Sequence, residues 1–502
     1  MKNSIHYLVI ICVFLFLVNG TGFAADNTMI KEDVYVVIKP IPGFGIYGNS
    51  IVPSPDSNHL ACVARKGDKY CIIYDGKPLT LYDSIAKDTP TFSLDSEHML
   101  YKAKKKNKWV VNLDSKEGKA YNGIGIPIFS PDCKRIYYVA EDLGKQVVVL
   151  DGKEGARYDG IPQERNLTFS PDSKHIAYAA FKNKKMLVVS DGKEGTIYDQ
   201  VSSPRFSPDS KVLVYPAEKG KKWFFVKNGV EDTKQYDAIG TYTFSPDSSH
   251  FSYSAKKGDK KFMVFDGKEG IPFNDIAMPI FSPDSKQLAY LGIENKKWFM
   301  VFNNEKGKPY DEIKDLSFSR DSLHHSLTVR NGNKWSVISD GKEGPKYDDV
   351  ALPLYTADSK HQIYLTSNNK KGRIVFDGKE SQPYDVVSLI VFSKDSQHMI
   401  FMAKKDGKWL IIKDGKESAQ YDGVALPTFS PDSKHYAFIC LKKDVWSIVC
   451  DGVGGKAEFA GFLKDSNIEF DSPTHIHTLA MQVVSGGTTP ELRFVKLTVD
   501  IK

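Results

Sequence analysis

One ten-residue sequence recurs along the chain at nearly constant intervals, and this repeat constrains the fold more than any other feature. FSPDSKHIAY at residues 169–178 returns as FSPDSKQLAY at 281–290 and as FSPDSKHYAF at 429–438. Fixed periods of roughly 20 to 50 residues are typical of solenoids, propellers and repeat arrays. The aspartate of each copy marks the period of 37 to 40 residues: Asp56, Asp95, Asp132, Asp172, Asp209, Asp247, Asp284, Asp321, Asp358, Asp395 and Asp432.

The contents of one unit, residues 204–239, favour a propeller blade. Ser-Pro-Asp-Ser at 207–210 suits a tight turn, and Asn228-Gly229 suits the hairpin turn that Asp-Gly makes in most other copies. Strands are expected at 212–217 and 223–227. Four short strands, three tight turns and no helical period are typical of a four-stranded antiparallel blade.

Alternating side chains indicate that each blade packs on both faces. In the strand that follows the turn at 170–173, the bulky Ile176 and Tyr178 alternate with the small Ala177 and Ala179. A bulky face of one blade then fits against a small face of the next. We therefore predict an all-β fold, a β-propeller of about twelve four-stranded blades.

The number of repeats bears on how the blades are grouped. A degenerate twelfth copy at 470–477 follows the clear ones, and twelve exceeds the four to eight blades of a typical propeller. We expect two six-bladed rings, a first propeller half at 26–270 and a second at 271–502; seven plus five blades, or one large ring, remain open. Residues 34–51 resemble the last strands of a unit, so the N-terminal strands are expected to close the last blade.

The repeat resembles a known family. FSPDSKHIAY, followed by a K-W-x-V-V-x-D-G strand, is similar to the WD40-like repeat of the TolB-like β-propeller family, over residues 50 to 480. The family usually has glycine where this chain mostly has serine, as at Ser173, Ser210 and Ser285. The resemblance implies the propeller fold only. The α/β domain that precedes the propeller in TolB has no counterpart in this sequence, so no Tol function is implied.

The first residues resemble an export signal. Lys2 precedes an apolar run at 7–18, and Gly22-Phe23-Ala24 is a small-x-small pattern that signal peptidase accepts. Twelve apolar residues are fewer than the roughly 20 that span a bilayer as a helix. We therefore expect a signal peptide at 1–25 and no transmembrane segment in the mature chain, which would be periplasmic or secreted.

Charge distribution indicates a candidate binding face. Lys and Arg number 68 against 62 Asp and Glu, a net charge of +6, which is too small to indicate a nucleic-acid partner. The loops joining the second and third strands are basic, so we predict binding of a protein partner or an anionic glycan there. The alternative is that these lysines only keep hairpin tips soluble and guard sheet edges. The candidate residues are Lys184, Lys185, Lys221, Lys222, Lys260, Lys261, Lys296, Lys297, Lys370 and Lys371.

The sequence contains no recognisable catalytic motif. Gly-x-Ser-x-Gly, His-Glu-x-x-His, a phosphate-binding glycine loop and Cys-x-x-Cys are all missing, so no catalytic residue, cofactor or metal is predicted. The alternative is a lyase or glycosidase whose acidic and histidine residues meet in a funnel. Propeller enzymes break their repeat locally, whereas here Arg165, Arg205, Arg320 and His325 are scattered deviations, which favours a binding protein.

Histidines follow the anchor aspartate by three residues in eight copies. One histidine per blade places neighbours at least about 10 Å apart, whereas metal ligands lie near 2 Å from the ion. A structural role is therefore expected. These residues are His59, His98, His175, His250, His324, His361, His398 and His435.

Three apolar segments are candidates for the lining of a central funnel. Residues 276–279, 350–353 and 424–427 lead into first strands and would line or plug a central funnel.

Five cysteines follow the expected signal peptide, and an odd number leaves at least one unpaired. A bridge between Cys62 and Cys71 stays open, while Cys440 and Cys450 are expected on opposite faces of their hairpin; the fifth is Cys133.

Overall fold

The computed structural model describes residues 30–39, 41–162, 167–463, 465–484 and 491–501. The expected signal peptide at 1–25 and Arg165 lie outside these residues. Within them the only helix is a short 3-10 turn, η1 (Gly48–Ser50), and all other regular structure is β-strand. No helix in this part of the chain has the length and apolarity that a bilayer crossing requires.

Twelve antiparallel sheets follow one another along the chain, and each is a four-stranded blade. Five sheets count a fifth strand because their first strand is interrupted. These sheets confirm the predicted all-β propeller of twelve blades. The expected division near residue 270 stays a prediction.

The blades fall into two compact units, Met1–Met99 with Ser388–Lys502 (the terminal unit) and Leu100–Val387 (the middle unit). The terminal unit holds β1 (Ile30–Ile38), β2 (Gly45–Ile46), β3 (Val52–Pro53), β4 (Leu60–Lys66), β5 (Lys69–Tyr74), β6 (Lys77–Pro78), β7 (Ser84–Ile85), β8 (Thr91–Phe92), β42 (Val386–Phe392), β43 (Met399–Lys405), β44 (Lys408–Lys413), β45 (Lys416–Glu417), β46 (Gly423–Phe429), β47 (Tyr436–Lys442), β48 (Val445–Cys450), β49 (Val453–Gly454), β50 (Gly461–Phe462), β51 (Glu469–Ser472), β52 (His475–Val484) and β53 (Glu491–Ile501).

The middle unit holds β9 (Met99–Lys105), β10 (Lys108–Leu113), β11 (Lys116–Glu117), β12 (Gly123–Ile124), β13 (Ile128–Phe129), β14 (Ile136–Asp142), β15 (Lys145–Leu150), β16 (Lys153–Tyr158), β17 (Leu167–Phe169), β18 (Ile176–Lys182), β19 (Lys185–Ser190), β20 (Lys193–Glu194), β21 (Gln200–Val201), β22 (Arg205–Phe206), β23 (Leu213–Lys219), β24 (Lys222–Lys227), β25 (Val230–Glu231), β26 (Ala238–Phe244), β27 (Phe251–Lys257), β28 (Lys260–Phe265), β29 (Lys268–Glu269), β30 (Asp275–Phe281), β31 (Leu288–Glu294), β32 (Lys297–Phe302), β33 (Glu305–Tyr310), β34 (Glu312–Phe318), β35 (His325–Asn331), β36 (Lys334–Ser339), β37 (Lys342–Glu343), β38 (Asp349–Tyr355), β39 (Gln362–Asn368), β40 (Lys371–Phe376) and β41 (Lys379–Glu380).

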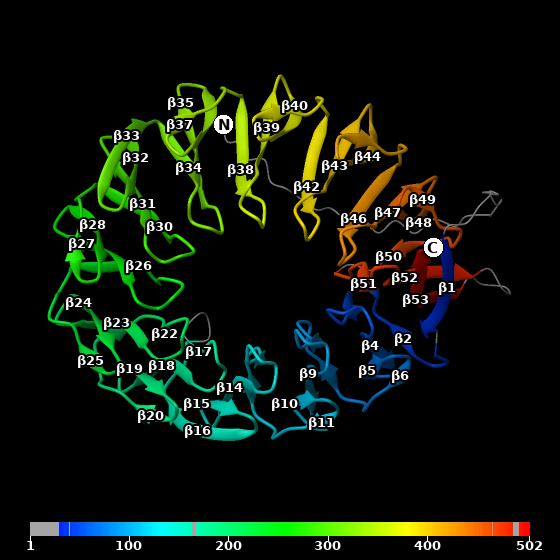
Figure 1. The fold of residues 1–502 in the computed structure, drawn as a ribbon. Coiled ribbons are helices and arrows are strands. Elements are labelled where there is room, and N and C mark those ends of the chain that lie inside the picture. Colours follow the sequence, from blue (N-terminus) through cyan, green and yellow to red (C-terminus); the bar gives the residue numbers. More distant parts are fainter. Residues whose placement is uncertain (1–29, 40, 163–166, 464, 485–490, 502) are drawn as a thin grey trace. The chain divides into compact units, whose positions relative to one another are not determined.

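The sheet β17–β18–β19–β20 illustrates how a blade is packed in the middle unit. Ile176 and Tyr178 belong to one buried cluster with side chains of the preceding sheet, including Val148. Ala177 and Ala179 belong to another cluster with Tyr215 of the following sheet. The alternation therefore places a bulky face and a small face on opposite sides of each sheet, as the sequence predicts. Figure 1 shows the first strands β26, β30, β34 and β38 following one another along one edge of this unit.

The first and last strands of the chain share one sheet of the terminal unit. Its order is β1–β53–β52–β50, with β51 beside β52. β1 runs antiparallel to β53, so that Val34 lies opposite Leu497. Buried side chains join this sheet to its neighbours on both sides: Leu479 and Phe494 cluster with Leu60, while Ile476 clusters with Ile439.

Candidate functional site

Hydrogen bonds hold the repeated Ser-Pro-Asp-Ser turn together and connect it to the next sheet. In one copy, the Ser170 hydroxyl donates to Asp172 at 2.6 Å and accepts the His175 N–H at 2.9 Å. The backbone N–H of Asp172 then donates to Ser210 of the next sheet at 3.0 Å. The same bond between sheets joins Asp132 to Ser173, Asp209 to Ser248, Asp247 to Ser285, Asp284 to Ser322 and Asp321 to Ser359 in the middle unit, and Asp56 to Ser96 and Asp395 to Ser433 in the terminal unit.

These turns lower the pKa of the anchor aspartates. Burial acts to raise the pKa of Asp56, but hydrogen bonds from Ser54 and Asn58 outweigh it and bring that pKa down to about 2. The Ser170 hydroxyl is the main cause of the lowered pKa of Asp172. The carboxylates therefore act as ionised acceptors within the fold, which is poor chemistry for general acids.

The histidines that follow the anchor aspartates bond to the Asp-Gly turn of their own sheet. His175 Nδ1 lies 2.7 Å from Asp191 Oδ2, and the other oxygen of Asp191 accepts the Ile176 N–H at 2.9 Å. Among the described residues, no group of three or more His, Cys, Asp and Glu side chains could hold a metal. The equivalent pairs are His59–Asp75, His250–Asp266, His324–Asp340, His361–Asp377, His398–Asp414 and His435–Asp451.

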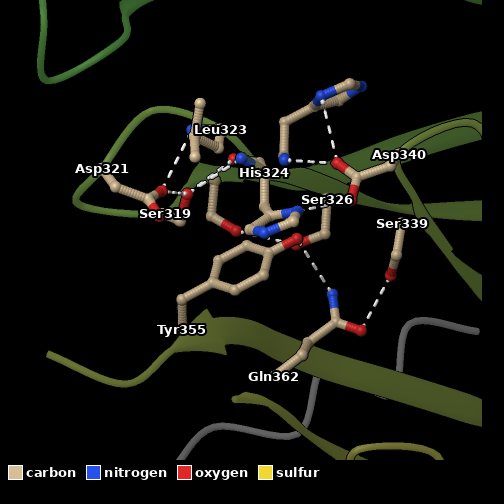
Figure 2. Close-up of polar contacts among 11 residues, drawn as sticks. Ser319, Asp321, Leu323, His324, Ser326, Ser339, Asp340, Tyr355 and Gln362 are labelled. Carbon is tan, nitrogen blue, oxygen red and sulfur yellow. Dashed lines mark hydrogen bonds and ion pairs between the residues drawn. The ribbon is translucent and has the colours of Figure 1, made fainter. Parts of the chain in front are cut away.

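The repeat deviates at His325, whose neighbours His324 and Ser326 are labelled in Figure 2. His324 contacts Asp340 at 2.7 Å, and His325 lies 3.6 Å from the same carboxylate. Burial lowers the pKa of His325 although Asp340 opposes the shift, and its ring stacks on Phe302 with centroids 5.0 Å apart. This imidazole is held by packing and one carboxylate.

The polar groups beside His325 bond to one another and link two sheets. The Ser339 hydroxyl donates to Gln362 at 2.8 Å, and the Gln362 amide donates to Tyr355 at 3.3 Å (Figure 2). Ser317 and Ser326 share a hydrogen bond of 2.9 Å. The bond from Ser339 to Gln362 therefore joins two neighbouring sheets close to this deviation. Elsewhere in this unit, Arg205 stacks over Tyr242 and likewise acts in packing.

The ten candidate lysines divide into two groups. The second lysine of each pair forms an ion pair with the aspartate of a Tyr-Asp or equivalent segment. Lys185 Nζ lies 2.9 Å from Asp199, whose other oxygen accepts the Gly220 N–H of the next hairpin at 2.8 Å. That N–H bond, followed by Lys185, lowers the pKa of Asp199. The other pairs are Lys222–Asp237, Lys261–Asp275, Lys297–Asp311 and Lys371–Asp385.

The first lysine of each pair is exposed. Four of these five lie at a hairpin tip and hold a left-handed backbone, with φ between +62° and +65°. Lys260 differs, because it is the first residue of β28 and lies opposite Lys257. None of the five side chains forms an ion pair or a hydrogen bond with another residue in the described ranges. The five are called the tip lysines below: Lys184, Lys221, Lys260, Lys296 and Lys370.

The sequence contains a signal for this division that residue composition alone misses. Each paired lysine precedes its aspartate by 14 or 15 residues, because the third strand starts and the fourth strand ends at the same edge of the sheet. The binding role of the lysines stays a prediction.

The apolar segments expected as loops are strands. Residues 276–279, 350–353 and 424–427 lie within β30, β38 and β46, and each strand has a β-bulge at that point. Met278 has φ of +53° and is 46% exposed. A bulge adds one residue to a strand and changes the direction of its side chain, which alternation does not reveal.

The cysteines of the terminal unit are unbridged. Cys62 and Cys71 are free and buried in one cluster, and burial raises the pKa of Cys62 to about 12. They lie diagonally, since Cys62 is opposite Ile73 and Cys71 is opposite Ala64. Cys440 and Cys450 belong to different clusters on the two faces of their sheet, as predicted.

Comparison with known proteins yields structural similarity at low identity. No protein-family model matches the chain, and no curated protein matches it. Among solved structures, TolB from Acinetobacter baumannii has a TM-score of 0.24 and 15% identity, covering 50% of this chain and 80% of its own. The Dos1 propeller has a TM-score of 0.28 and 12% identity, covering 59% of this chain and 92% of its own. The β-propeller domain of the trilobed protease from Pyrococcus furiosus has a TM-score of 0.26 and 15% identity, covering 52% and 96%.

Proposed function

We propose that this protein is an exported, non-enzymatic β-propeller that binds an acidic partner, a protein or an anionic glycan, through its tip lysines. One observation carries the proposal. Of the ten candidate lysines, five form ion pairs with aspartates that lie at the junction with the following sheet, and the five tip lysines are left exposed.

Consecutive sheets of the middle unit repeat this arrangement, so the tip charges form a series rather than one isolated site. Clustered positive charge raises the local concentration of anions and speeds their association. Such attraction weakens with salt, since the Debye length is about 8 Å at physiological ionic strength. A partner bound mainly by the tip lysines should therefore dissociate as salt is raised.

Matched charge variants test this proposal. In the test variant, Lys184, Lys221, Lys296 and Lys370 are replaced by glutamine. In the control, Lys174, Lys211, Lys286 and Lys360 are replaced by glutamine; these exposed lysines belong to the same four sheets but lie at the other end of the strands. Both variants lose four positive charges. Retention on immobilised heparin and on poly-L-glutamate is measured in a salt gradient.

The test variant should elute at lower salt than the wild type on at least one matrix, and the control should elute with the wild type. A preference for heparin favours a glycan partner, and a preference for poly-L-glutamate favours an acidic protein. Equal loss in both variants would attribute retention to net charge and contradict the proposal. Turnover of a glycan panel by the wild-type protein would favour the alternative lyase or glycosidase.

Export and family membership belong to the same proposal. The sequence at 1–25 supports export to the periplasm or the medium, and the SPDS repeat supports membership of the TolB-like family. N-terminal sequencing of the protein from its natural host should find a mature chain that begins after Ala24 or Ala25.

A further inference from the structure

A groove of about 340 Å³ crosses the first strands of three consecutive sheets in the terminal unit. It is lined by residues from the ends of β42 and β46 and from β51, together with the turns that follow the first two. Small-molecule sites are concave and typically occupy about 300–1,000 Å³. The groove is therefore large enough for a small organic molecule.

Three half-buried phenylalanines give the groove an apolar wall. Phe392, Phe429 and Phe470 all line it. Each is the phenylalanine that precedes the repeated turn, so the repeat itself places one ring per sheet at this position. Aromatic faces attract apolar groups and also cations.

Two charged residues line the groove, and one of them departs from the repeat. Lys394 stands where most copies have the proline of Ser-Pro-Asp-Ser, and it is exposed. Glu469 stands in β51 where β46 has Thr428, and it is half-buried. Both side chains line the groove. The groove therefore holds one cation and one carboxylate beside its aromatic wall.

Neither charge is neutralised within the described part of the chain, where Glu469 and Lys394 form no ion pair. Burial raises the pKa of Glu469, while Asn467 and His477 oppose the shift. Withdrawing a carboxylate from water costs free energy unless a cation or hydrogen-bond donor compensates. Asn467 already supplies one hydrogen bond to this carboxylate, and the ammonium group of a ligand would add a full positive charge beside it.

We propose that this groove binds a free hydrophobic α-amino acid or a molecule of the same chemistry. The ammonium group lies against Glu469, the carboxylate against Lys394, and the apolar side chain against the three phenylalanine rings. The proposal concerns a different surface and a different ligand from those of the tip lysines, so either can fail without the other.

Calorimetric titration of the full chain tests the groove with three probes. L-Phenylalanine carries both charges, its amide lacks the carboxylate, and N-acetyl-L-phenylalanine lacks the ammonium group. L-Phenylalanine should bind, and each modified probe should bind about tenfold more weakly, the scale of one lost charged hydrogen bond.

Two variants assign the charges. Lys394→Ala should weaken L-phenylalanine about tenfold and leave the amide unchanged. Glu469→Gln should weaken L-phenylalanine similarly and leave the N-acetyl probe unchanged. Lys434→Ala is the matched control, because Lys434 is an exposed lysine of the next turn that does not line the groove. It should bind all three probes as the wild type does.

A loss of binding in Lys394→Ala can be distinguished from unfolding, because Lys394 is exposed and its replacement leaves the core intact. Absence of L-phenylalanine binding at about 1 mM would overturn the proposal. Binding that neither variant changes would also overturn it, since the ligand would then lie elsewhere. Circular dichroism of Glu469→Gln establishes that the variant is folded before its affinity is read.

Discussion

Ser210 holds its backbone in the left-handed region, with φ of +65°, and its hydroxyl accepts the N–H of Asp172 from the preceding sheet. Glycine adopts this φ without steric cost but has no hydroxyl to offer. Serine at this position therefore exchanges some backbone strain for a bond between neighbouring blades. This accounts for the serines that stand where the TolB-like repeat usually has glycine.

Substitutions at Ser210 separate the two effects. Ser210→Ala keeps the strain and loses the bond, so it should lower the free energy of unfolding by about 1–2 kcal/mol. Ser210→Gly loses the bond but relieves strain of about 1–2 kcal/mol, so it should lie close to the wild type. Thermal unfolding of the three proteins checks the order. Equal destabilisation by alanine and glycine would contradict a contribution of backbone strain at Ser210.

The anchor aspartates predict a loss of stability in acid. The pKa of Asp56 falls from 3.8 to about 2 on folding, and the pKa of its counterparts also falls. A carboxylate with a lowered folded pKa stabilises the fold above its unfolded pKa and loses this effect as pH falls toward the folded value. The melting temperature should therefore be nearly constant from neutral pH to about pH 5 and fall below about pH 4.

Asp56→Asn provides the comparison for this pH dependence. The amide cannot ionise, so the variant should be less stable at neutral pH and should lose less stability between about pH 4 and pH 2 than the wild type. Identical pH profiles for the two proteins would contradict a contribution from Asp56.

At the scale of the strands and hairpins, each Tyr-Asp segment links two blades. Asp199 lies between two sheets, and its carboxylate accepts hydrogen bonds from Lys185 of the preceding sheet and from the Gly220 N–H of the next hairpin. An exposed ion pair contributes little by itself, whereas a carboxylate bonded to a backbone N–H is a stronger contact. Most of the effect of this aspartate should therefore come from the hairpin that it holds.

Paired substitutions measure that difference. Asp199→Ala should lower the melting temperature more than Lys185→Ala, because it removes both the ion pair and the bond to the following sheet. Hydrogen exchange at Gly220 should accelerate in Asp199→Ala and remain nearly unchanged in Lys185→Ala. A larger effect of the lysine substitution on either measurement would contradict this account.

Much of each blade could be predicted from the sequence, because its turn residues and alternation are local signals. Ile176 and Ala177 are consecutive in a strand, so their side chains must point to opposite faces of the sheet. Asn228-Gly229 predicts a hairpin turn because both residues readily adopt a positive φ. The bulge at Met278 could not be predicted, since methionine gives no sign of a positive φ. The spacing that distinguishes Lys185 from Lys184 could be recognised only with the structure, because it does not by itself identify Asp199 as the partner of Lys185.

At the scale of the whole chain, the sheet shared by β1 and β53 depends on residues at both ends of the sequence. Leu497 is fully buried, whereas its partner Val34 in β1 is 38% exposed. The Glu32 carboxylate accepts the N–H groups of Lys456 and Ala457 at 2.6 and 2.8 Å, and so ties β1 to the segment after β49. The inner strand supplies buried area and the outer strand supplies hydrogen bonds.

The same substitution on the two partners tests this distinction. Leu497→Ala should cost about 2–5 kcal/mol, the usual cost of truncating a buried leucine. Val34→Ala should cost less than about 1 kcal/mol, since much of its side chain already contacts water. Chemical unfolding of both variants measures the difference. A larger loss for Val34→Ala would contradict the burial that separates the two strands.

β53 lies between β1 and β52, although β1 and β53 are far apart in the sequence. Because β1 precedes β53 in the chain, it is synthesised earlier and must wait for the strand that it pairs with. A chain that stops before residue 491 would leave β1 without that strand, and an unmatched strand edge invites aggregation. Truncation at this point should consequently harm the protein as much as a large internal deletion.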